Sequence, residues 1–277
     1  MNIDQIIENA LIEDIGDGDH TSLSCIPPKA QGRAKLLIKN KGILAGITIA
    51  EKIFKKVDAE LKMNIILHDG AKIQSGDIAF YVEGSSISIL SAERLVLNFM
   101  QRMSGIATAT YELTEIIKGT KAKILDTRKT TPLLRKIEKM SVKIGGGYNH
   151  RMGLYDMIMI KDNHIDFAGG IEKAINSTKD YLKKKNKDLQ IEIEARSLDD
   201  VKEIMKAGCV QRIMLDNFSP DKLNEAIMLI NGKYETEASG GITKENILAY
   251  AESGVDYISV GAITHHIKSL DMSLKAV

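Results

Sequence analysis

The sequence predicts an α/β fold in two parts. Up to about Met103, short β-rich runs bounded by Gly and Asp indicate an α+β region with a mainly antiparallel sheet. After Gly105, short apolar runs alternate with helical segments, which is typical of βαβ units and a parallel sheet. The later strands end at intervals of 22, 23 and 22 residues, at Glu194, Asp216, Ser239 and Gly261. Such a regular strand–helix repeat forms a (β/α) barrel or a doubly wound sheet.

Composition limits the class of protein. With 277 residues, 44% of them hydrophobic and 27% charged, the chain can form a barrel and a smaller companion domain. A net charge of +1 disfavours a duplex DNA-binding protein, and 5% aromatic residues without Trp disfavour a base-stacking platform. The acidic start and the lack of a membrane-length apolar run predict no targeting peptide and no membrane span. With Cys25 and Cys209 read as free thiols, we expect a cytoplasmic globular protein.

The N-terminal region is expected to hold three helices and four strands. Apolar spacing predicts helices at 3–12, 50–57 and 91–103. The third helix carries Arg94 on a polar face, as an ordinary solvated charge would be. The acidic loop at 14–20 is read as a capped, solvated turn rather than a metal loop, because Asp and Gly favour turns. The β-rich runs are residues 34–40, 43–49, 64–70 and 78–84.

The second region shows clear helix boundaries. Ser197 and the Ser219-Pro220 pair are typical N-terminal signals, Gly208 is a C-terminal one, and Thr243 is expected to cap the last long helix. The expected strands are residues 122–126, 156–162, 189–195, 212–216, 234–240 and 256–262.

Polar residues at the ends of these strands favour the barrel. In a barrel the carboxyl ends of the strands meet at one mouth, where the chemistry takes place. Residues that only pack need no charge there, although an ordinary-turn explanation stays open. The polar ends are Asp126-Thr127-Arg128, Lys161 to His164, Glu194, Asp216, Ser239 to Gly241, and Gly261.

Cations gather between Asp126 and His164, in a chain whose total charge is almost balanced. Concentrated cations at element ends indicate a site for a polyanionic small molecule. Guanidinium groups can bind the carboxylates of such a molecule in a bidentate way. The histidine could bind a carboxylate or pack as a neutral residue, and the last lysine could form a Schiff base. The cations are Arg128, Lys129, His150, Arg151 and Lys161, beside the glycines at 145–147.

Two Gly-rich turns and two carboxylates complete the candidate site. The turns at 238–242 and 259–264 follow the last two strands, where backbone N–H groups can bind a phosphate. Glu194 and Asp216 could bind Mg²⁺ directly or through water, or act as a general acid and base. A cation-rich, phosphate-binding mouth favours the metal role.

Several long segments of the chain resemble one family, the quinolinate phosphoribosyltransferases, also called nicotinate-nucleotide pyrophosphorylases (carboxylating). The resemblance extends over nearly the whole chain. Its segments are EDIGDGDHTS at 13–22, SAERLVLNFMQRMSGIAT at 91–108, DTRKTTP at 126–132, GGGYNHRMGLYDMIMIKDNH at 145–164, IEIEA at 191–195, IMLDN at 213–217, EASGGI at 237–242 and ISVGAIT at 258–264.

The resemblance implies a fold and a reaction. The fold would be an N-terminal α/β sandwich domain at 1–104, joined by 265–277, plus an incomplete, seven-stranded α/β barrel at 105–264. The enzyme would be a homodimer or a higher multiple, such as a hexamer. It would transfer phosphoribose from phosphoribosyl pyrophosphate to quinolinate, with Mg²⁺, giving nicotinate mononucleotide, pyrophosphate and CO₂.

Site residues follow from the same resemblance. Lys161, Glu194 and Asp216 would be catalytic, and the two carboxylates would lie near the ribose and Mg²⁺, possibly through water or substrate phosphates. Arg94 would reach the site of the neighbouring subunit. The quinolinate pocket would hold Arg128, His150, Arg151 and Lys161, with Thr127 and Lys129 beside it. The phosphate turns would be formed by Ser239, Gly240, Gly241, Val260, Gly261 and Ala262. Leu133 stands where the family pattern leads us to expect Gly, which puts the local loop shape in doubt.

Three alternatives stay open. The chain could be a paralogue of this family with another acceptor, such as the homologue encoded with molybdate transporters. It could be a Schiff-base lyase that uses Lys161. It could also be a non-catalytic anion- or RNA-binding module, although the carboxylates among the cations disfavour that.

Overall fold

The computed structural model describes residues 2–277 and divides the chain into two compact units. The first unit comprises residues up to Tyr111, Thr130–Gly146 and Ile263–Val277; the second comprises Glu112–Lys129 and Gly147–Ala262. Segment 130–146 thus groups with the N-terminal residues, whereas the predicted division places it in the barrel. Compact units need not coincide with domains, so the predicted limits at 104 and 264 stay a prediction.

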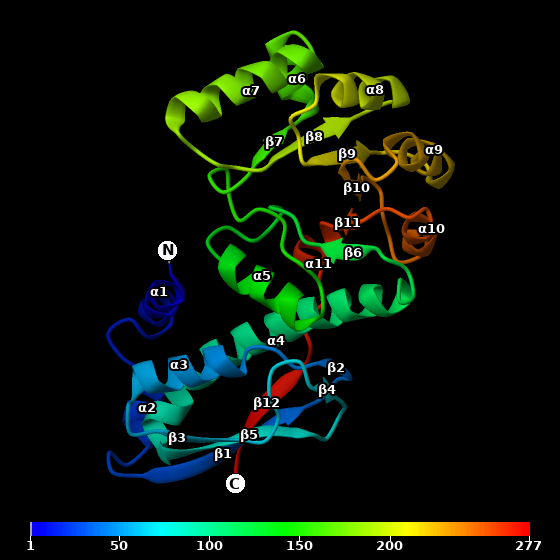
Figure 1. The fold of residues 1–277 in the computed structure, drawn as a ribbon. Helices are drawn as coiled ribbons and strands as arrows, with labels where there is room; N and C mark the ends of the chain where they lie inside the picture. The colour runs from blue at the N-terminus through cyan, green and yellow to red at the C-terminus, as the bar shows by residue number, and fades with distance from the viewer. Residues whose placement is uncertain (1) are drawn as a thin grey trace. The chain divides into compact units, whose positions relative to one another are not determined.

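The first unit contains an antiparallel sheet in which the end of the chain pairs with its beginning. The strand order is β12-β1-β5-β3, and every neighbouring pair is antiparallel (Figure 1). A separate two-stranded sheet joins β2 to β4. The strands are β1 (Gln31–Ile38), β2 (Gly42–Ile43), β3 (Lys62–Ile65), β4 (Lys72–Ile73), β5 (Ile78–Ser85) and β12 (Met272–Ala276).

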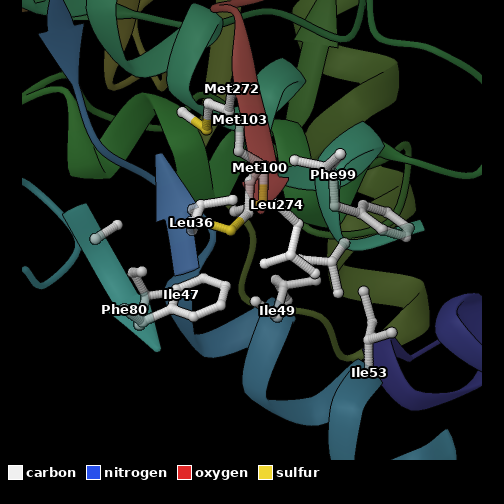
Figure 2. Close-up of a cluster of buried hydrophobic side chains, with 14 of the residues drawn as sticks. Leu36, Ile47, Ile49, Ile53, Phe80, Phe99, Met100, Met103, Met272 and Leu274 are labelled. Carbon is white, nitrogen blue, oxygen red and sulfur yellow. The ribbon is translucent and has the colours of Figure 1, made fainter. Parts of the chain in front are cut away.

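Helices and sheet of this unit enclose one apolar core. Strand, helix and C-terminal side chains meet in it, as Figure 2 shows for Leu36, Phe80, Met100 and Met272. Burial of such side chains is the main favourable term in folding. The helices are α1 (Ile3–Ile15), α2 (His20–Cys25), α3 (Ile47–Val57), α4 (Ser86–Ile116), which extends into the second unit, and α5 (Arg135–Ile144).

A buried ion pair ties α5 to α4 within the first unit. Arg102 on α4 donates to Glu138 on α5, with 2.6 Å between Nη2 and Oε1, and the Glu138 side chain is fully buried. The same guanidinium donates to the Thr131 hydroxyl at 2.7 Å. Removing one partner of a buried pair leaves a costly unpaired charge, so this contact explains why segment 130–146 belongs here.

The predicted strand at 43–49 is largely wrong. Only Ile43 lies in a strand, and Ile47 already begins α3. Gly46 adopts a positive φ of 105°, and the Asp69 carboxylate accepts the N–H groups of Gly46 and Ile47 at 2.7 and 2.9 Å. Such capping satisfies amides that a helix leaves open at its start. Because Asp69 is distant in sequence, the β-branched pattern of residues 43–49 could not indicate that a helix starts there.

The predicted helix at 91–103 is much longer, and Gly105 does not end it. Gly105 lies inside α4. A Cβ built there would lie 2.5 Å from the carbonyl oxygen of Lys268. Glycine is therefore needed because the C-terminal segment passes close to the helix, not because the helix stops.

Two of the three predicted N-caps are confirmed. The hydroxyl of Ser197 accepts the Asp200 N–H at the start of α8 (Leu198–Ala207), and Ser219 does the same for Lys222 at the start of α9 (Pro220–Ile230). Thr243 is not a cap, because α10 (Ile247–Glu252) starts later, after Asn246, whose side chain accepts the Thr243 N–H at 2.7 Å. The predicted turn is confirmed at 16–19, between α1 and α2, and Asp19 caps α2.

The second unit contains a parallel sheet of six strands, in the order β6-β11-β10-β9-β8-β7 (Figure 1). Each of the six predicted segments contains a strand, but several strands are shorter than predicted, and Asp162 and Ala262 already begin helices. They are β6 (Lys123–Leu125), β7 (Ile158–Ile160), β8 (Ile191–Ala195), β9 (Arg212–Asp216), β10 (Glu235–Ser239) and β11 (Tyr257–Ser259). The helices between and after them are α6 (Asp162–Ala168), α7 (Ile171–Lys185), α8 (Leu198–Ala207), α9 (Pro220–Ile230), α10 (Ile247–Glu252) and α11 (Ala262–His265).

The seventh position of the sheet is a single-residue bridge. Tyr148 pairs in parallel with Leu125, and its N–H donates to the Ile124 carbonyl at 2.8 Å. Within residues 2–277, no strand pairing joins β7 to the Tyr148 end, so the sheet is not closed. The predicted fold class, a small sheet domain with an incomplete α/β barrel, is confirmed. Among the described residues no helix is long and apolar enough to cross a membrane.

Leu133 tests the cost of a side chain in the left-handed region. It has φ of 67° and is 70% exposed, so it contributes little packing. A Cβ in that conformation costs roughly 1–2 kcal/mol, whereas glycine costs roughly 0.5–1 kcal/mol in chain entropy elsewhere. We expect Leu133→Gly to be more stable than Leu133→Ala by about 0.5–1 kcal/mol in urea unfolding, the reverse of the usual order. An alanine variant that is the more stable would contradict this account.

Candidate active site

The carboxyl ends of the parallel strands bring the predicted site residues of the second unit to one edge of the sheet. Because parallel strands run in the same direction, residues that follow them share an edge. The register places Ser239 beside Asp216, and Glu194 one strand away beside Met214. The residues at this edge are Asp126, Lys161, Glu194, Asp216, Ser239 and Val260.

Glu194 links two neighbouring strand ends. Its buried carboxylate accepts a hydrogen bond from the Lys161 ammonium through Oε1, and the Asp162 N–H donates to Oε2 at 3.1 Å. The acid is thus held at the start of α6, where the helix dipole favours negative charge. The pairing fixes where the Lys161 charge can lie.

Asp216 is affected by the negative charge of Glu194. Burial raises the pKa of its carboxyl group, and the negative charge of Glu194 raises it further, while Lys161 opposes the shift. The Asn217 amide donates to Asp216 Oδ2 at 2.8 Å. Two carboxylates that repel each other favour a cation nearby, but both oxygens of Glu194 already accept hydrogen bonds, so they are poorly placed to bind a metal ion directly.

Two guanidinium groups lie near each other at the same edge. Burial lowers the pKa of Arg151, and the positive charge of Arg128 lowers it further. Nearby carboxylates, Glu192 first, oppose the shift, and Arg151 Nη1 donates to the Met157 carbonyl at 3.2 Å. Neighbouring guanidinium groups are stabilised by an anion that binds both, such as a dicarboxylate.

The segment after β6 forms a local turn that carries two predicted residues. The Lys129 N–H donates to the Thr127 hydroxyl at 3.0 Å, as expected for a Ser/Thr turn. Thr127 is half-buried and the Lys129 side chain is exposed. The turn therefore brings the exposed Lys129 side chain next to Arg128 in the chain.

His150 is buried, and both of its ring nitrogens have partners inside the protein. Nε2 lies 2.8 Å from Glu192 Oε2 and 3.5 Å from Glu237 Oε2. Nδ1 accepts the N–H of Arg151 at 2.6 Å. A nitrogen that accepts a hydrogen bond carries no proton, so this geometry assigns the proton to Nε2.

Glu192 and Glu237 are functional candidates that the sequence analysis missed. Both side chains are fully buried on strands β8 and β10, and Arg212 on β9 donates to Glu237 Oε2 at 3.1 Å. Burial raises the pKa of Glu192 to about 7 and that of Glu237 to about 8. The available signal was alternation: Glu192 and Glu194 are two residues apart and so point to the same face of the strand.

These two acids and His150 form the one group in residues 2–277 with three closely spaced potential metal ligands, within 4.8 Å of one another. Arg212 already supplies a positive charge there, and Arg151 lies close enough to affect Glu192. A metal cation would be repelled by both guanidinium groups. The cluster therefore fits a hydrogen-bonded network better than a metal site.

The predicted phosphate turns differ in their backbone geometry. Gly240 and Gly241 have positive φ values of 93° and 63°, and a Cβ on Gly240 would lie 2.2 Å from Asn217 Oδ1. Val260 is buried, Gly261 is half-buried, and Ala262 starts the four-residue helix α11. The next helix after Gly241, α10, begins only at Ile247. The groups that could donate hydrogen bonds to a phosphate there are therefore the backbone N–H groups of the turns.

Arg94 is an exposed residue on α4 in the first unit. The structure therefore does not group it with the predicted residues of the second unit. Its predicted role in a neighbouring subunit stays a prediction.

Comparison with known families identifies this arrangement. Residues 19–104 match the family described as quinolinate phosphoribosyl transferase, N-terminal domain, and residues 106–275 match the corresponding C-terminal domain. The chain belongs to the quinolinate phosphoribosyltransferase family. The resemblance inferred from its segments is thereby confirmed.

Relatives of this family match the chain almost end to end. Quinolinate phosphoribosyltransferase [decarboxylating] 1 of Nicotiana glauca is 48% identical, over 98% of this chain and 81% of that protein. A probable nicotinate-nucleotide pyrophosphorylase [carboxylating] of Bacillus subtilis is 40% identical, over 99% of this chain and 93% of that protein. The crystal structure of NadC from Streptococcus pyogenes, 40% identical, superposes with a TM-score of 0.94 over 99% of this chain and 95% of that one.

The pKa of Glu237 predicts a pH dependence of stability. Its folded pKa of about 8 exceeds the ordinary value of 4.5, so the folded state keeps a proton that the unfolded chain releases between these values. Wild-type stability should therefore fall as pH rises from about 4.5 to 8. In Glu237→Gln this fall should be weaker by more than about 1 kcal/mol, measured by urea unfolding at pH 5 and pH 8.5.

The matched control is Glu235→Gln, on the same strand and also bound to Arg212 but 46% exposed. Its fall should equal that of the wild type. Equal slopes for all three proteins would refute the buried, protonated state of Glu237.

Proposed function

We propose that this chain is a decarboxylating quinolinate phosphoribosyltransferase. It transfers phosphoribose from phosphoribosyl pyrophosphate to quinolinate and yields nicotinate mononucleotide, pyrophosphate and CO₂, a step of de novo NAD biosynthesis. The observation that carries this proposal is the near-complete family match, on a chain whose paired guanidinium groups suit a dicarboxylate.

Quinolinate would bind to the cationic part of the edge. Arg128 and Arg151 would each take a carboxylate, and Lys161 would complete the charge balance. A monoacid would leave one half-buried guanidinium without a carboxylate, which is costly and therefore favours the diacid. Thr127 and Lys129 line the same pocket in this proposal, His150 belongs to it through its hydrogen bond with the Arg151 backbone, and Arg94 enters it from a neighbouring subunit.

Phosphoribosyl pyrophosphate would bind to the acidic and Gly-rich part. Loss of pyrophosphate develops positive charge on the ribose, which the carboxylates of Glu194 and Asp216 would stabilise. Mg²⁺, when bound to the substrate, neutralises the leaving group, and both carboxylates would hold it through water or phosphate oxygens. The phosphate contacts are assigned to Ser239, Gly240, Gly241, Val260, Gly261 and Ala262.

The bond changes proceed in two steps. The quinolinate ring nitrogen forms a bond to the anomeric carbon while the bond to pyrophosphate breaks. The pyridinium cation then accepts the electron pair released when the adjacent carboxylate leaves as CO₂, and a proton replaces it on the ring carbon. Cations that clamp the carboxylates hold the ring nitrogen in line for the first step.

The alternatives are disfavoured by specific contacts. The Lys161 amine donates to Glu194, whereas a Schiff-base nucleophile needs a free lone pair. A simple anion- or RNA-binding module would have no use for Glu194 and Asp216 among its cations. A paralogue with another acceptor is separated from this proposal by assay.

We further propose a cytoplasmic homo-oligomer. Cys25 and Cys209 are exposed free thiols, which suits a reducing compartment, although several plant relatives are named as mitochondrial or chloroplastic. The family resemblance suggests a dimer or hexamer with shared sites.

The reaction assay combines protein, Mg²⁺, phosphoribosyl pyrophosphate and quinolinate, and follows nicotinate mononucleotide and CO₂. Arg151→Ala should lower kcat/KM for quinolinate at least about a hundredfold, because loss of a bidentate charge pair costs on the order of 3 kcal/mol. Arg33→Ala, whose guanidinium lies over Tyr81 in the first unit, is the control and should behave as wild type. No product from folded wild-type protein would reject quinolinate, and near-normal turnover by Arg151→Ala would reject the pocket.

The role of Arg94 is tested by subunit complementation. Arg94→Ala and Lys161→Ala should each be nearly inactive. If sites are shared in a two-fold dimer, a mixed dimer of the two variants contains one intact site. Mixing after subunit exchange should restore about a quarter of wild-type activity, since half of the random dimers are mixed and carry one of two sites. No recovery from mixtures shown to contain mixed dimers would place Arg94 outside the neighbouring site.

A further inference from the structure

We propose that Glu192 and Glu237 are positioning residues for substrate binding, because they fix the His150 ring and the ring fixes the backbone of Arg151. This inference rests on the proposed function, in which Arg151 binds a quinolinate carboxylate. The two acids lie on β8 and β10, on either side of β9, and reach the same ring nitrogen.

The contacts of His150 leave its ring no direct role as a donor to substrate. Nε2–H donates to Glu192, 2.8 Å away, and Nδ1 accepts from the amide of Arg151 at 2.6 Å. Both nitrogens are therefore used between the buried acids and the backbone of the next residue. The ring acts on the substrate through Arg151.

The backbone of this segment is held from the other side as well. The His150 N–H donates to Asp126 Oδ1 at 2.9 Å, and the Asp126 N–H donates to the Tyr148 carbonyl at 3.1 Å. These bonds attach the segment to the end of β6. The Arg151 guanidinium donates to the Met157 carbonyl, so the residue is held at both its backbone and its side chain.

Arg212 on β9 binds Glu237, one of the two acids. Its Nη1 donates to Glu237 at 3.1 Å, and its Nη2 donates to Glu235 at 2.9 Å. The guanidinium also lies 4.0 Å from the centre of the Tyr257 ring. It therefore has several contacts of its own, and it orients the Glu237 carboxyl group toward His150.

Packing alone does not account for these acids. Interior positions of parallel barrels are usually filled by branched apolar residues, and burying a carboxyl group has a free-energy cost that such residues avoid. Glu192 and Glu237 are both fully buried, and each retains one oxygen, Oε1, without a hydrogen-bond partner in the described structure. A requirement for an acceptor at His150 Nε2 explains why acids occupy these positions.

The test separates a hydrogen-bonding role from a space-filling one. Glu192→Leu keeps bulk but removes the acceptor, whereas the amide oxygen of Glu192→Gln can still accept from Nε2–H. Calorimetric titration should show quinolinate binding at least about tenfold weaker in Glu192→Leu and within about threefold of wild type in Glu192→Gln. Binding of phosphoribosyl pyrophosphate should change by less than about twofold in both.

Glu237 has its own matched control. Glu237→Leu should weaken quinolinate binding, whereas Glu235→Leu should leave it unchanged, because Glu235 binds the same arginine from the exposed side. In an Arg151→Ala background, Glu192→Leu should add less than about a twofold further loss, since its effect passes through Arg151.

A measurement on the unaltered protein covers the case in which the leucine variants fail to fold. Nitrogen-15 NMR of histidine-labelled protein should show His150 as the neutral Nε2–H tautomer, assigned by the signal lost in His150→Gln. A proton on Nδ1 would overturn the inference. So would equal losses of both substrates in Glu192→Leu, or wild-type quinolinate binding in that variant. An inactive wild-type enzyme would instead reject the proposed function, and this inference with it.

Discussion

The register of the parallel sheet is the constraint on which the site depends. It places Arg212 between Glu192 and Glu235 on the neighbouring strands, and Glu237 two residues after Glu235 on β10. Because strand side chains alternate between faces, a slip of one residue would move every one of these groups to the opposite face. Buried acids and a buried arginine tolerate no such slip, so the charges themselves help to select this register.

The charged residues of the sheet form two levels with different tasks. The deeper level, Glu192, Glu237, Arg212 and His150, is joined by hydrogen bonds within the protein. The level at the strand ends, with Arg128, Arg151, Lys161, Glu194 and Asp216, keeps groups that suit anions and a bound cation. A nearly neutral chain can therefore carry a strongly charged site, because its positive and negative residues balance in number but lie at different places in the sheet.

Glycine and leucine positions show how the first unit deals with backbone constraints. Gly46 and Gly105 stand where a side chain would meet neighbouring atoms of the same unit. Leu133 is the opposite case: it carries a side chain although its backbone conformation favours glycine, and it lies on an exposed loop. Loops accept such strain more readily than cores, because nothing packed against them has to move.

The sequence by itself determined the features that depend on neighbours along the chain. The six later strands, the Ser197 and Ser219 caps, the two-part fold and the family were all predicted from local pattern and motif. Only the tertiary structure decided the start of α3, where Asp69 accepts the N–H groups, the length of α4 past Gly105, and the contacts of His150 with Glu192 and Glu237. The physical reason is the same in each case: the deciding partner is distant in sequence, so no periodicity or propensity near the residue reports it.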